Sequence, residues 1–210
     1  MRLAAVAVVS LLMFGSAAHA ATPAEQFVQQ SADSAVAILK DKSLDAAARE
    51  AKLRDFLVAL LDLHRMAIFA LGPAASSVSP GDLNAYLDAY TQFAIANYDS
   101  EFGAYGGQAI QVAGSVQRSD TDFVVNANIT DPTSPSAPPD SVSFRVLSAN
   151  GKFSIVDASV QGVWFTIAQR DDFAGFLKQN GGSVPALTAR LRDMAAKLRS
   201  GAAQPAMPGK

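Results

Sequence analysis

The sequence predicts an α+β domain in which helices come first, an antiparallel sheet follows, and helices close the chain. Three observations predict it. Apolar residues recur every three or four positions up to about residue 102, the period of a helix that buries one face. Between residues 108 and 155 they alternate with polar or small residues, as in strands with one buried face. After about residue 166 the helical period returns, and such segregation is typical of the α+β class.

Residues 1–20 have the pattern of a cleavable signal peptide. Arg2 supplies a positive charge, and residues 3–14 form an apolar run interrupted only by Ser10. Ala18-His19-Ala20 then provides a small-residue cleavage site. The apolar run is too short for a membrane span, which needs about 20 residues. The alternative to cleavage is that the segment is retained as a short N-terminal anchor. The pattern predicts cleavage after Ala20 and export from the cytoplasm.

The composition of the exported chain excludes some partners. Loss of residues 1–20 removes one basic residue and no acidic one, so 16 Lys and Arg remain beside 19 Asp and Glu. The resulting formal charge of −3 is a poor match for nucleic acid. The sequence has no cysteine, so neither a disulfide nor the lipid anchor of a lipoprotein is expected.

Residues 21–201 have the length and composition of a single domain with a substantial core. Half of the sequence is hydrophobic, and 12 Phe stand beside a single Trp. Such side chains line a core or a cavity without needing hydrogen-bond partners, so composition leaves both open. Residues 202–210 carry Pro205 and Pro208, and we expect a disordered tail there.

The segment before the strands predicts helices that each bury one apolar stripe. Residues 24–40 have apolar residues at helical spacing, and Ser43 is expected to cap the next helix. A short apolar piece then ends at Gly72-Pro73, and Ser79 and Pro80 begin a long helix. The stripe of the second helix is Leu53, Phe56, Leu57, Leu60, Leu61 and His64. The stripe of the long helix is Leu83, Tyr86, Leu87, Tyr90, Ala94 and Tyr98.

The middle of the chain predicts a meander of four antiparallel strands. Alternating residues place the strands around residues 110–116, 123–129, 142–146 and 153–155. Asn150-Gly151 is a strong signal for a two-residue hairpin turn between the third strand and the fourth. Prolines between the second and third strands indicate a loop.

Two helices are predicted at the end of the chain. The first runs from about residue 166 to 179, turns Phe173, Phe176 and Leu177 inward, and ends at Gly181-Gly182. Ser183 is expected to cap the second helix, whose stripe is Val184, Leu187, Leu191, Met194 and Leu198.

Groups that perform catalysis are sparse. His64 is the one histidine of the exported chain, and no GxSxG or HExxH motif accompanies it. Because His64 ends an apolar stripe, we interpret it as a structural or pocket-edge residue. A catalytic role would need a nucleophile beside it. Adjacent Asp171 and Asp172 suit the dipole of a helix start. We therefore expect no enzymatic activity, no metal site and no cofactor.

Several short motifs follow one another in order along the exported chain. They are Leu71-Gly72; Tyr90-Thr91-Gln92-Phe93 through Tyr98, Phe102, Tyr105 and Gly106; Asp157-x-x-Val160-x-Gly162-Val163; Gln169-Arg170-Asp171-Asp172-Phe173; and Leu187-x-x-x-Leu191. In this order and spacing they resemble the MlaC/toluene-tolerance (Ttg2D-like) family of periplasmic phospholipid-binding proteins. The resemblance covers residues 22 to about 199.

One departure from the family pattern concerns the ligand. Most members have a small Ser after the Gly-Val pair, where this chain has Trp164-Phe165. With Asn180-Gly181-Gly182, this feature resembles the hopanoid-associated, HpnM-like branch of the family. A diacyl phospholipid and a rigid polycyclic lipid need differently shaped cavities, so the resemblance leaves both as the expected ligand.

The resemblance also implies a fold and a function. The fold is a twisted four-stranded antiparallel sheet against the N- and C-terminal helices, with an apolar cavity between them. The function is that of a soluble, monomeric periplasmic carrier, which moves lipid between an outer-membrane lipoprotein complex and an inner-membrane ABC transporter complex to maintain outer-membrane lipid asymmetry. The residues expected to line the cavity are Leu60, Met66, Phe69, Tyr90, Tyr98, Tyr105, Ile129, Phe144, Val146, Val163, Trp164 and Ile167. The alternative is a non-catalytic periplasmic protein-interaction or assembly module whose core is filled.

Overall fold

The fold was analysed in a computed structural model, which describes residues 20–102 and 106–203. The expected signal peptide up to residue 19, the last seven positions of the expected tail, and Tyr105 lie outside the described residues. No helix in the described part of the chain is long and apolar enough to cross a bilayer.

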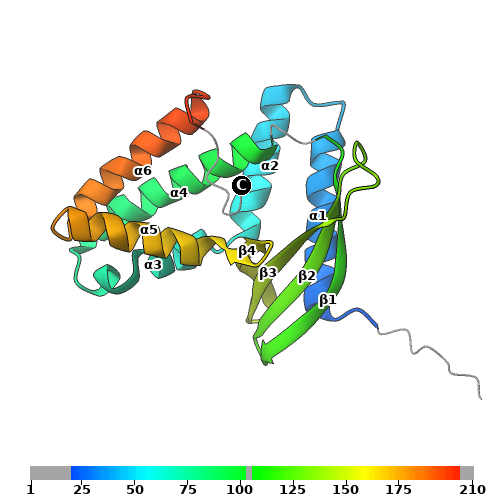
Figure 1. The fold of residues 1–210 in the computed structure, drawn as a ribbon, viewed down its shortest axis with the longest axis horizontal. Coiled ribbons are helices and arrows are strands. Elements are labelled where there is room, and N and C mark those ends of the chain that lie inside the picture. Colours follow the sequence, from blue (N-terminus) through cyan, green and yellow to red (C-terminus); the bar gives the residue numbers. More distant parts are fainter. Residues whose placement is uncertain (1–19, 103–105, 204–210) are drawn as a thin grey trace, which may run out of the picture.

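The described chain forms two parts that lie side by side, a sheet covered by a helix and a layer of helices (Figure 1). The helices are α1 (Pro23–Lys40), α2 (Ala46–Leu60), α3 (Leu63–Leu71), α4 (Pro80–Phe102), α5 (Phe165–Gln179) and α6 (Val184–Arg199), with a 3-10 helix, η1, over Gly72–Ser76. The strands are β1 (Ala109–Ser119), β2 (Asp122–Thr130), β3 (Asp140–Ala149), β4 (Lys152–Val160) and β5 (Val163–Trp164). Helices therefore precede and follow the sheet, as the α+β prediction requires.

The strands form one antiparallel sheet in the order β1-β2-β3-β4-β5. Asn150 and Gly151 have φ of 51° and 74°, which confirms the predicted hairpin between β3 and β4, since such turns need φ above zero at both positions. The prediction of four strands is wrong, because β5 is a fifth that pairs with Ser159 and Val160. A strand of two residues is too short to show the alternation on which the prediction depended.

Local capping residues begin several helices. The Ser79 hydroxyl accepts a hydrogen bond from the N–H of Asp82 at 3.1 Å, and Ser183 caps α6, as predicted. Ser43, however, does not cap α2, because its N–H and hydroxyl donate to the Asp41 carboxylate. Asp45 caps α2 instead, since its carboxylate accepts from the N–H of Ala48 at 2.8 Å.

The predicted stripe from Leu53 to His64 is broken where the chain meets the sheet. Helix α2 ends at Leu60, and Leu61 forms a parallel β-bridge with Ile155 of β4. Asp62 then donates its backbone N–H to Ile155 O at 2.9 Å and caps α3 with its side chain. His64 is consequently exposed on α3 and does not continue the stripe of α2.

Helices α3, α4, α5 and α6 enclose the larger of two apolar clusters, here called the helical core. Its centre is aromatic: Tyr86 and Tyr90 are 0% exposed and Phe173 is 2% exposed. The edge of Phe173 meets both tyrosines, with ring centroids 6.5 and 6.4 Å apart. The Tyr86 hydroxyl donates to Ala67 O at 3.0 Å, and the Tyr90 hydroxyl donates to Gln169 Oε1 at 2.7 Å. These contacts join α3, α4 and α5 into one packed unit.

Substitution of Phe173 tests this packing. We expect Phe173→Ala to lower the free energy of unfolding by about 3 to 5 kcal/mol, because it removes a buried ring and leaves a cavity. Phe69→Ala is the matched control, since Phe69 is 36% exposed, and its expected cost is about 1 kcal/mol. Urea unfolding measures both, and equal costs would contradict the description of the helical core.

Candidate functional site

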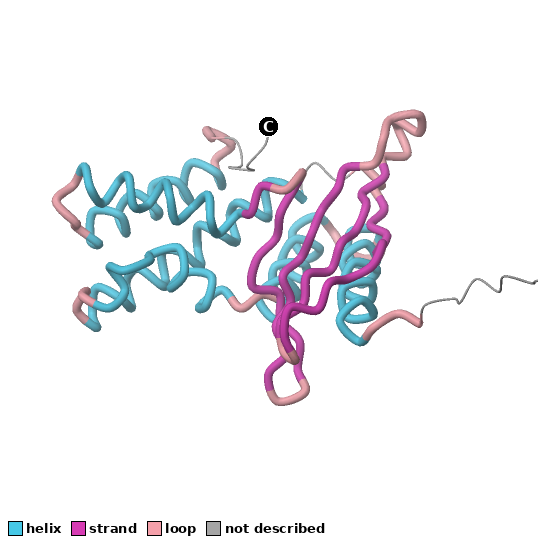
Figure 2. Tube along the Cα trace, turned by 60° about the horizontal axis from the view of Figure 1, so that its bottom comes forward, coloured by secondary structure: helices cyan, strands magenta, loops and turns pink. Residues whose placement is uncertain are grey.

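The sheet carries a second apolar cluster, here called the sheet core, beneath α1. Figure 2 shows the strands as a layer with helices behind it on one side. The buried members are Ala24, Val28, Val125, Val146 and Ile155, and the partly buried members are Phe27, Leu60, Leu61, Val112, Phe123, Phe144 and Phe153. The strand pairing places Phe123, Val125, Phe144 and Val146 on one face. The predicted apolar face is thus confirmed.

The phenylalanine rings of the sheet core are only partly covered. Phe153 lies 5.5 Å from Phe27 and 6.2 Å from Phe123, measured between ring centroids, yet all three remain partly exposed, as does Phe144. The aromatic rings at the centre of the helical core are, in contrast, almost fully buried. Apolar surface near an existing core contributes about 25 cal/mol per Å² when a further apolar group covers it. The sheet core therefore offers apolar surface that a further apolar group can cover.

Strand β4 connects the two clusters. Leu61, which pairs with Ile155 of this strand, packs against both the helical core and the sheet core. At the C-terminal end of β4, Ser159 and Val160 pair with β5, which leads directly into α5. The helical layer is thus attached to the sheet at two points along one strand.

Asp157 of β4 holds the second of these attachments. Its carboxylate is 5% exposed and accepts hydrogen bonds from the Thr166 N–H at 3.0 Å and the Thr166 hydroxyl at 2.6 Å. Trp164, the residue before α5, makes no capping bond with its side chain, so Asp157 acts as the cap from a neighbouring strand. Burial raises the pKa of the Asp157 carboxyl above its usual value, although the bonds from Thr166 and Ala158 and the charge of Arg145 oppose this rise.

A closed crevice and an open pocket lie next to each other between α2 and α4. The crevice is too tight to admit water and is lined mainly by apolar side chains, among them Leu57, Leu61 and Tyr98. Burial raises the pKa of Tyr98 to about 12, and the nearby charge of Asp157 adds to the rise. The pocket has a volume of about 660 Å³, within the range of about 300–1,000 Å³ found for small-molecule sites.

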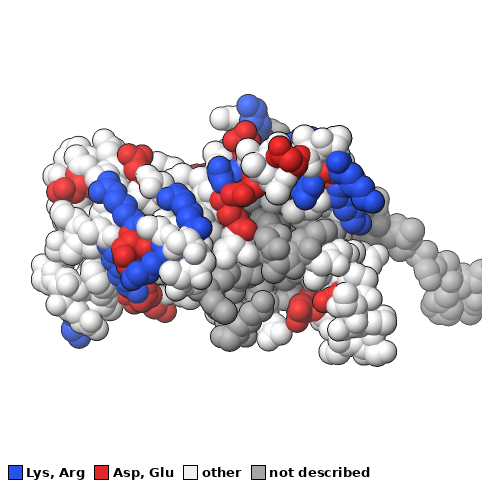
Figure 3. Space-filling view, turned by 90° about the horizontal axis from the view of Figure 1, so that it is seen from above, with Lys and Arg blue, Asp and Glu red and all other residues white. Residues whose placement is uncertain are grey.

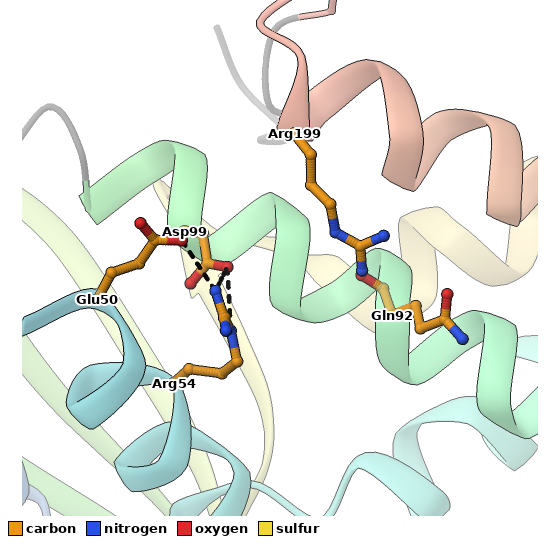
Figure 4. A network of polar contacts seen from close by, with 5 residues as sticks. All are labelled: Glu50, Arg54, Gln92, Asp99 and Arg199. Atoms are coloured by element: carbon orange, nitrogen blue, oxygen red, sulfur yellow. Dashed lines mark hydrogen bonds and ion pairs between the residues drawn. The ribbon is translucent and has the colours of Figure 1, made fainter. Parts of the chain in front are cut away.

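An ion pair joins α2 to α4 where the crevice and the pocket meet. Arg54 donates to Asp99 Oδ2 through Nη2 at 2.9 Å and through Nε at 3.3 Å, and Nη2 also reaches Glu50 at 2.8 Å (Figure 4). The hydrogen bond to Asp99 is the main cause that raises the pKa of Arg54. Arg54 and Asp99 line both the crevice and the pocket.

The structure brings together only some of the residues expected to line a cavity. Leu60, Phe144 and Val146 lie in the sheet core, and Ile129 is half-buried on the same face of β2. The others are distributed over the helical part and the β5–α5 junction. Met66, Tyr90 and Tyr98 belong to the helical core, Trp164 is half-buried in β5, and Phe69, Val163 and Ile167 are exposed.

Two features of this region were not predicted from the sequence. Arg54 and Asp99 are 45 positions apart, and nothing in the local pattern of either helix connects them. Asp157 entered the prediction only through a motif, because its role as a cap depends on how β4 meets α5. The alternation of β3 did place Phe144 and Val146 on the apolar face.

The chain belongs to the MlaC family: the family model described as "MlaC protein" matches residues 29–193. A solved structure of similar fold is the phospholipid-binding protein from Ralstonia solanacearum, determined in complex with a phospholipid. The match has a TM-score of 0.73 and 22% identity, and it covers 85% of this chain and 99% of that chain. No curated protein matches the chain.

The pKa of Asp157 predicts how stability depends on pH. A carboxyl whose pKa is higher in the folded state than in the unfolded state, about 3.9, favours folding most when it is protonated. We expect the difference in unfolding free energy between wild type and Asp157→Asn to fall as pH rises from about 4 to about 6. Urea unfolding across this range measures it, and a difference that grows with pH would show that the folded pKa is lowered.

Proposed function

We propose that this chain is a soluble periplasmic lipid carrier. It binds the acyl chains of a phospholipid, or a hopanoid-type lipid, between the apolar face of the sheet and the helices. The observation that carries the proposal is the sheet core, whose phenylalanines are partly uncovered beside a packed helical core. Membership of the MlaC family and the likeness in fold to a protein that holds a phospholipid support it.

The energetics of lipid transfer explain why a carrier needs such a face. Each buried methylene contributes about 0.8 kcal/mol, so two C16 chains with about 30 methylenes contribute on the order of 20 kcal/mol when fully buried. A lipid does not leave a membrane unaided at a useful rate against a free energy of this size. The carrier must therefore offer comparable apolar surface, to which the half-covered rings of the sheet core contribute.

The carrier exchanges its lipid with an outer-membrane lipoprotein complex and an inner-membrane ABC transporter complex, and so maintains outer-membrane lipid asymmetry. Cleavage after Ala20 releases a single domain over residues 21–201 that is free to move between the membranes. A retained apolar segment would tether it to one of them. The chain acts as a monomer and needs no cofactor.

The walls of the cavity come from both parts of the fold. Leu60, Ile129, Phe144 and Val146 contact the acyl chains from the sheet side, where they already share one apolar face or its edge. Met66, Tyr90 and Tyr98 form the helical side, and the expected contribution of Tyr105 lies outside the described residues. Phe69, Val163, Trp164 and Ile167 lie toward the β5–α5 junction, where the ligand leaves the cavity.

The second candidate function is a periplasmic protein-interaction or assembly module with a filled core. The closed crevice and the almost fully buried rings of the helical core favour it. In this case the uncovered phenylalanines of the sheet core would contact a protein partner and no lipid would be bound.

Lipid extraction separates the two functions. We expect protein purified from the periplasm of a Gram-negative host to carry lipid in stoichiometric amount, because the sheet core holds acyl chains through isolation. Mass spectrometry of an organic extract measures it. A protein that holds no lipid, both as purified and after incubation with phospholipid vesicles, would refute the carrier function and leave the assembly module.

The single tryptophan tests the position of the cavity wall. A large ring at Trp164 narrows the cavity, so Trp164→Ser is expected to shift the bound lipids toward longer or bulkier chains. The control is Val116→Ser, because Val116 is 58% exposed on β1 and should leave the lipid profile unchanged. If Trp164→Ser also leaves lipid content and chain-length distribution unchanged, Trp164 does not line the cavity.

A further inference from the structure

The pocket between α2, α4 and α6 combines an apolar floor with a charged rim. Leu53, Ala96 and Leu198 are buried at its floor. The rim contains three arginines, Arg49, Arg54 and Arg199, and two acids, Glu50 and Asp99. This combination suits a ligand that has both an apolar part and an anionic group.

Two of the three arginines have no carboxylate partner among the residues that the structure describes. Arg49 donates only to carbonyl oxygens, to Leu44 O at 2.9 Å and to Asp41 O at 3.4 Å. Arg199 donates to the carbonyl oxygen of Gln92 at 3.4 Å (Figure 4). A guanidinium bound to neutral oxygens keeps its full charge and has donors left for an anion.

Arg54 differs from these two because Glu50 and Asp99 neutralise it. The three arginines and two acids of the lining sum to a formal charge of +1. The arginines without a carboxylate partner among the described residues are Arg49 and Arg199. On the face seen in Figure 3, acidic and basic side chains are intermingled. The pocket thus offers a local binding charge rather than part of a broad basic surface.

The crevice beside the pocket leads toward both cores. It begins at Arg54 and Asp99, which line the pocket as well, and continues along Leu57 and Tyr98. It reaches Leu61, the residue that packs against the helical core and the sheet core alike. Apolar side chains thus lie between the charged rim and Leu61, which also packs against the sheet core, and the crevice that they line is too tight to admit water in this structure.

We propose that this pocket favours the headgroup of an anionic lipid over that of a zwitterionic lipid through the guanidinium groups of Arg49 and Arg199, while an acyl chain widens the crevice between α2 and α4 and follows it toward Leu61. The inference rests on the proposed carrier function and adds a preference of headgroup to it. Phosphate oxygens accept paired hydrogen bonds from guanidinium groups. Both kinds of headgroup carry this phosphate, but the zwitterionic one adds a cation that the arginines repel. Because the rim is accessible to water, the difference is modest, and we expect about fivefold more loading of an anionic phospholipid than of a zwitterionic one.

The test compares loading from vesicles of phosphatidylglycerol and of phosphatidylcholine with matched acyl chains. We expect the Arg49→Gln/Arg199→Gln variant to load both lipids equally, because the positive charge that separates the two headgroups is gone. The control variant, Lys178→Gln/Arg192→Gln, removes the same charge from exposed positions outside the pocket lining and should keep the fivefold preference. Because Arg49 also bonds the chain before α2, Arg199→Gln alone is measured too and should reduce the preference about twofold.

Each outcome decides the inference. The headgroup site is overturned if the wild type loads both lipids equally. It is also overturned if the double variant keeps the wild-type preference. Both results leave the carrier function standing. Wild type that loads neither lipid refutes the carrier function itself. Millimolar inorganic phosphate should leave the preference unchanged, since the acyl chains hold the lipid in place. Phosphate that abolishes the preference while lipid stays bound would make the pocket a site for the free anion.

Discussion

The attachment of the helical layer to strand β4 is the constraint on which the rest of the structure depends. Leu61 pairs with Ile155, and two residues further along the strand the buried carboxylate of Asp157 binds the N–H and hydroxyl of Thr166. These contacts set the position of α3 and α5 against the sheet edge. Two separate clusters result, because the helical layer meets the sheet along one strand and does not cover its apolar face. The phenylalanines of the sheet core therefore remain partly uncovered, and this property favours a lipid-binding function in a member of the MlaC family.

Features of the fold that depend on residues close together in the sequence could be predicted. The caps Ser79 and Ser183 act within three residues of their helix starts, and Asn150-Gly151 defines its turn alone. The prediction that Ser43 caps α2 is wrong because its N–H and hydroxyl donate to the carboxylate of Asp41, two residues earlier. The break after α2 could not be predicted, since Leu61 leaves the helix to pair with a strand far along the chain. The short strand β5 has the same cause, because only its pairing with β4 defines it.

In the candidate site, too, features set by residues close in sequence could be predicted, and contacts between distant segments could not. Alternation along β2 and β3 predicts which side chains share the apolar face, so the sequence alone identifies Ile129, Phe144 and Val146 as members of that face. Contacts between distant segments could not be predicted in this way: Arg49 and Arg199 lie near opposite ends of the chain and meet only at one pocket. The resemblance to the MlaC family supplied the ligand class, which periodicity alone does not separate from a filled core. The placement of residues in three dimensions adds the charged rim, the crevice and the junction at Leu61.

The most direct test of the account is to map where the acyl chain lies. A phospholipid with a photoactivatable diazirine in its acyl chain is loaded into the wild-type protein, irradiated, and located by mass spectrometry of the digested peptides. The account predicts cross-links on the peptides of β3 and of the α2–α3 junction, which contain Phe144, Val146, Leu60 and Leu61. Cross-links confined to the exposed surface of α3 and α5, or none at all, would contradict it.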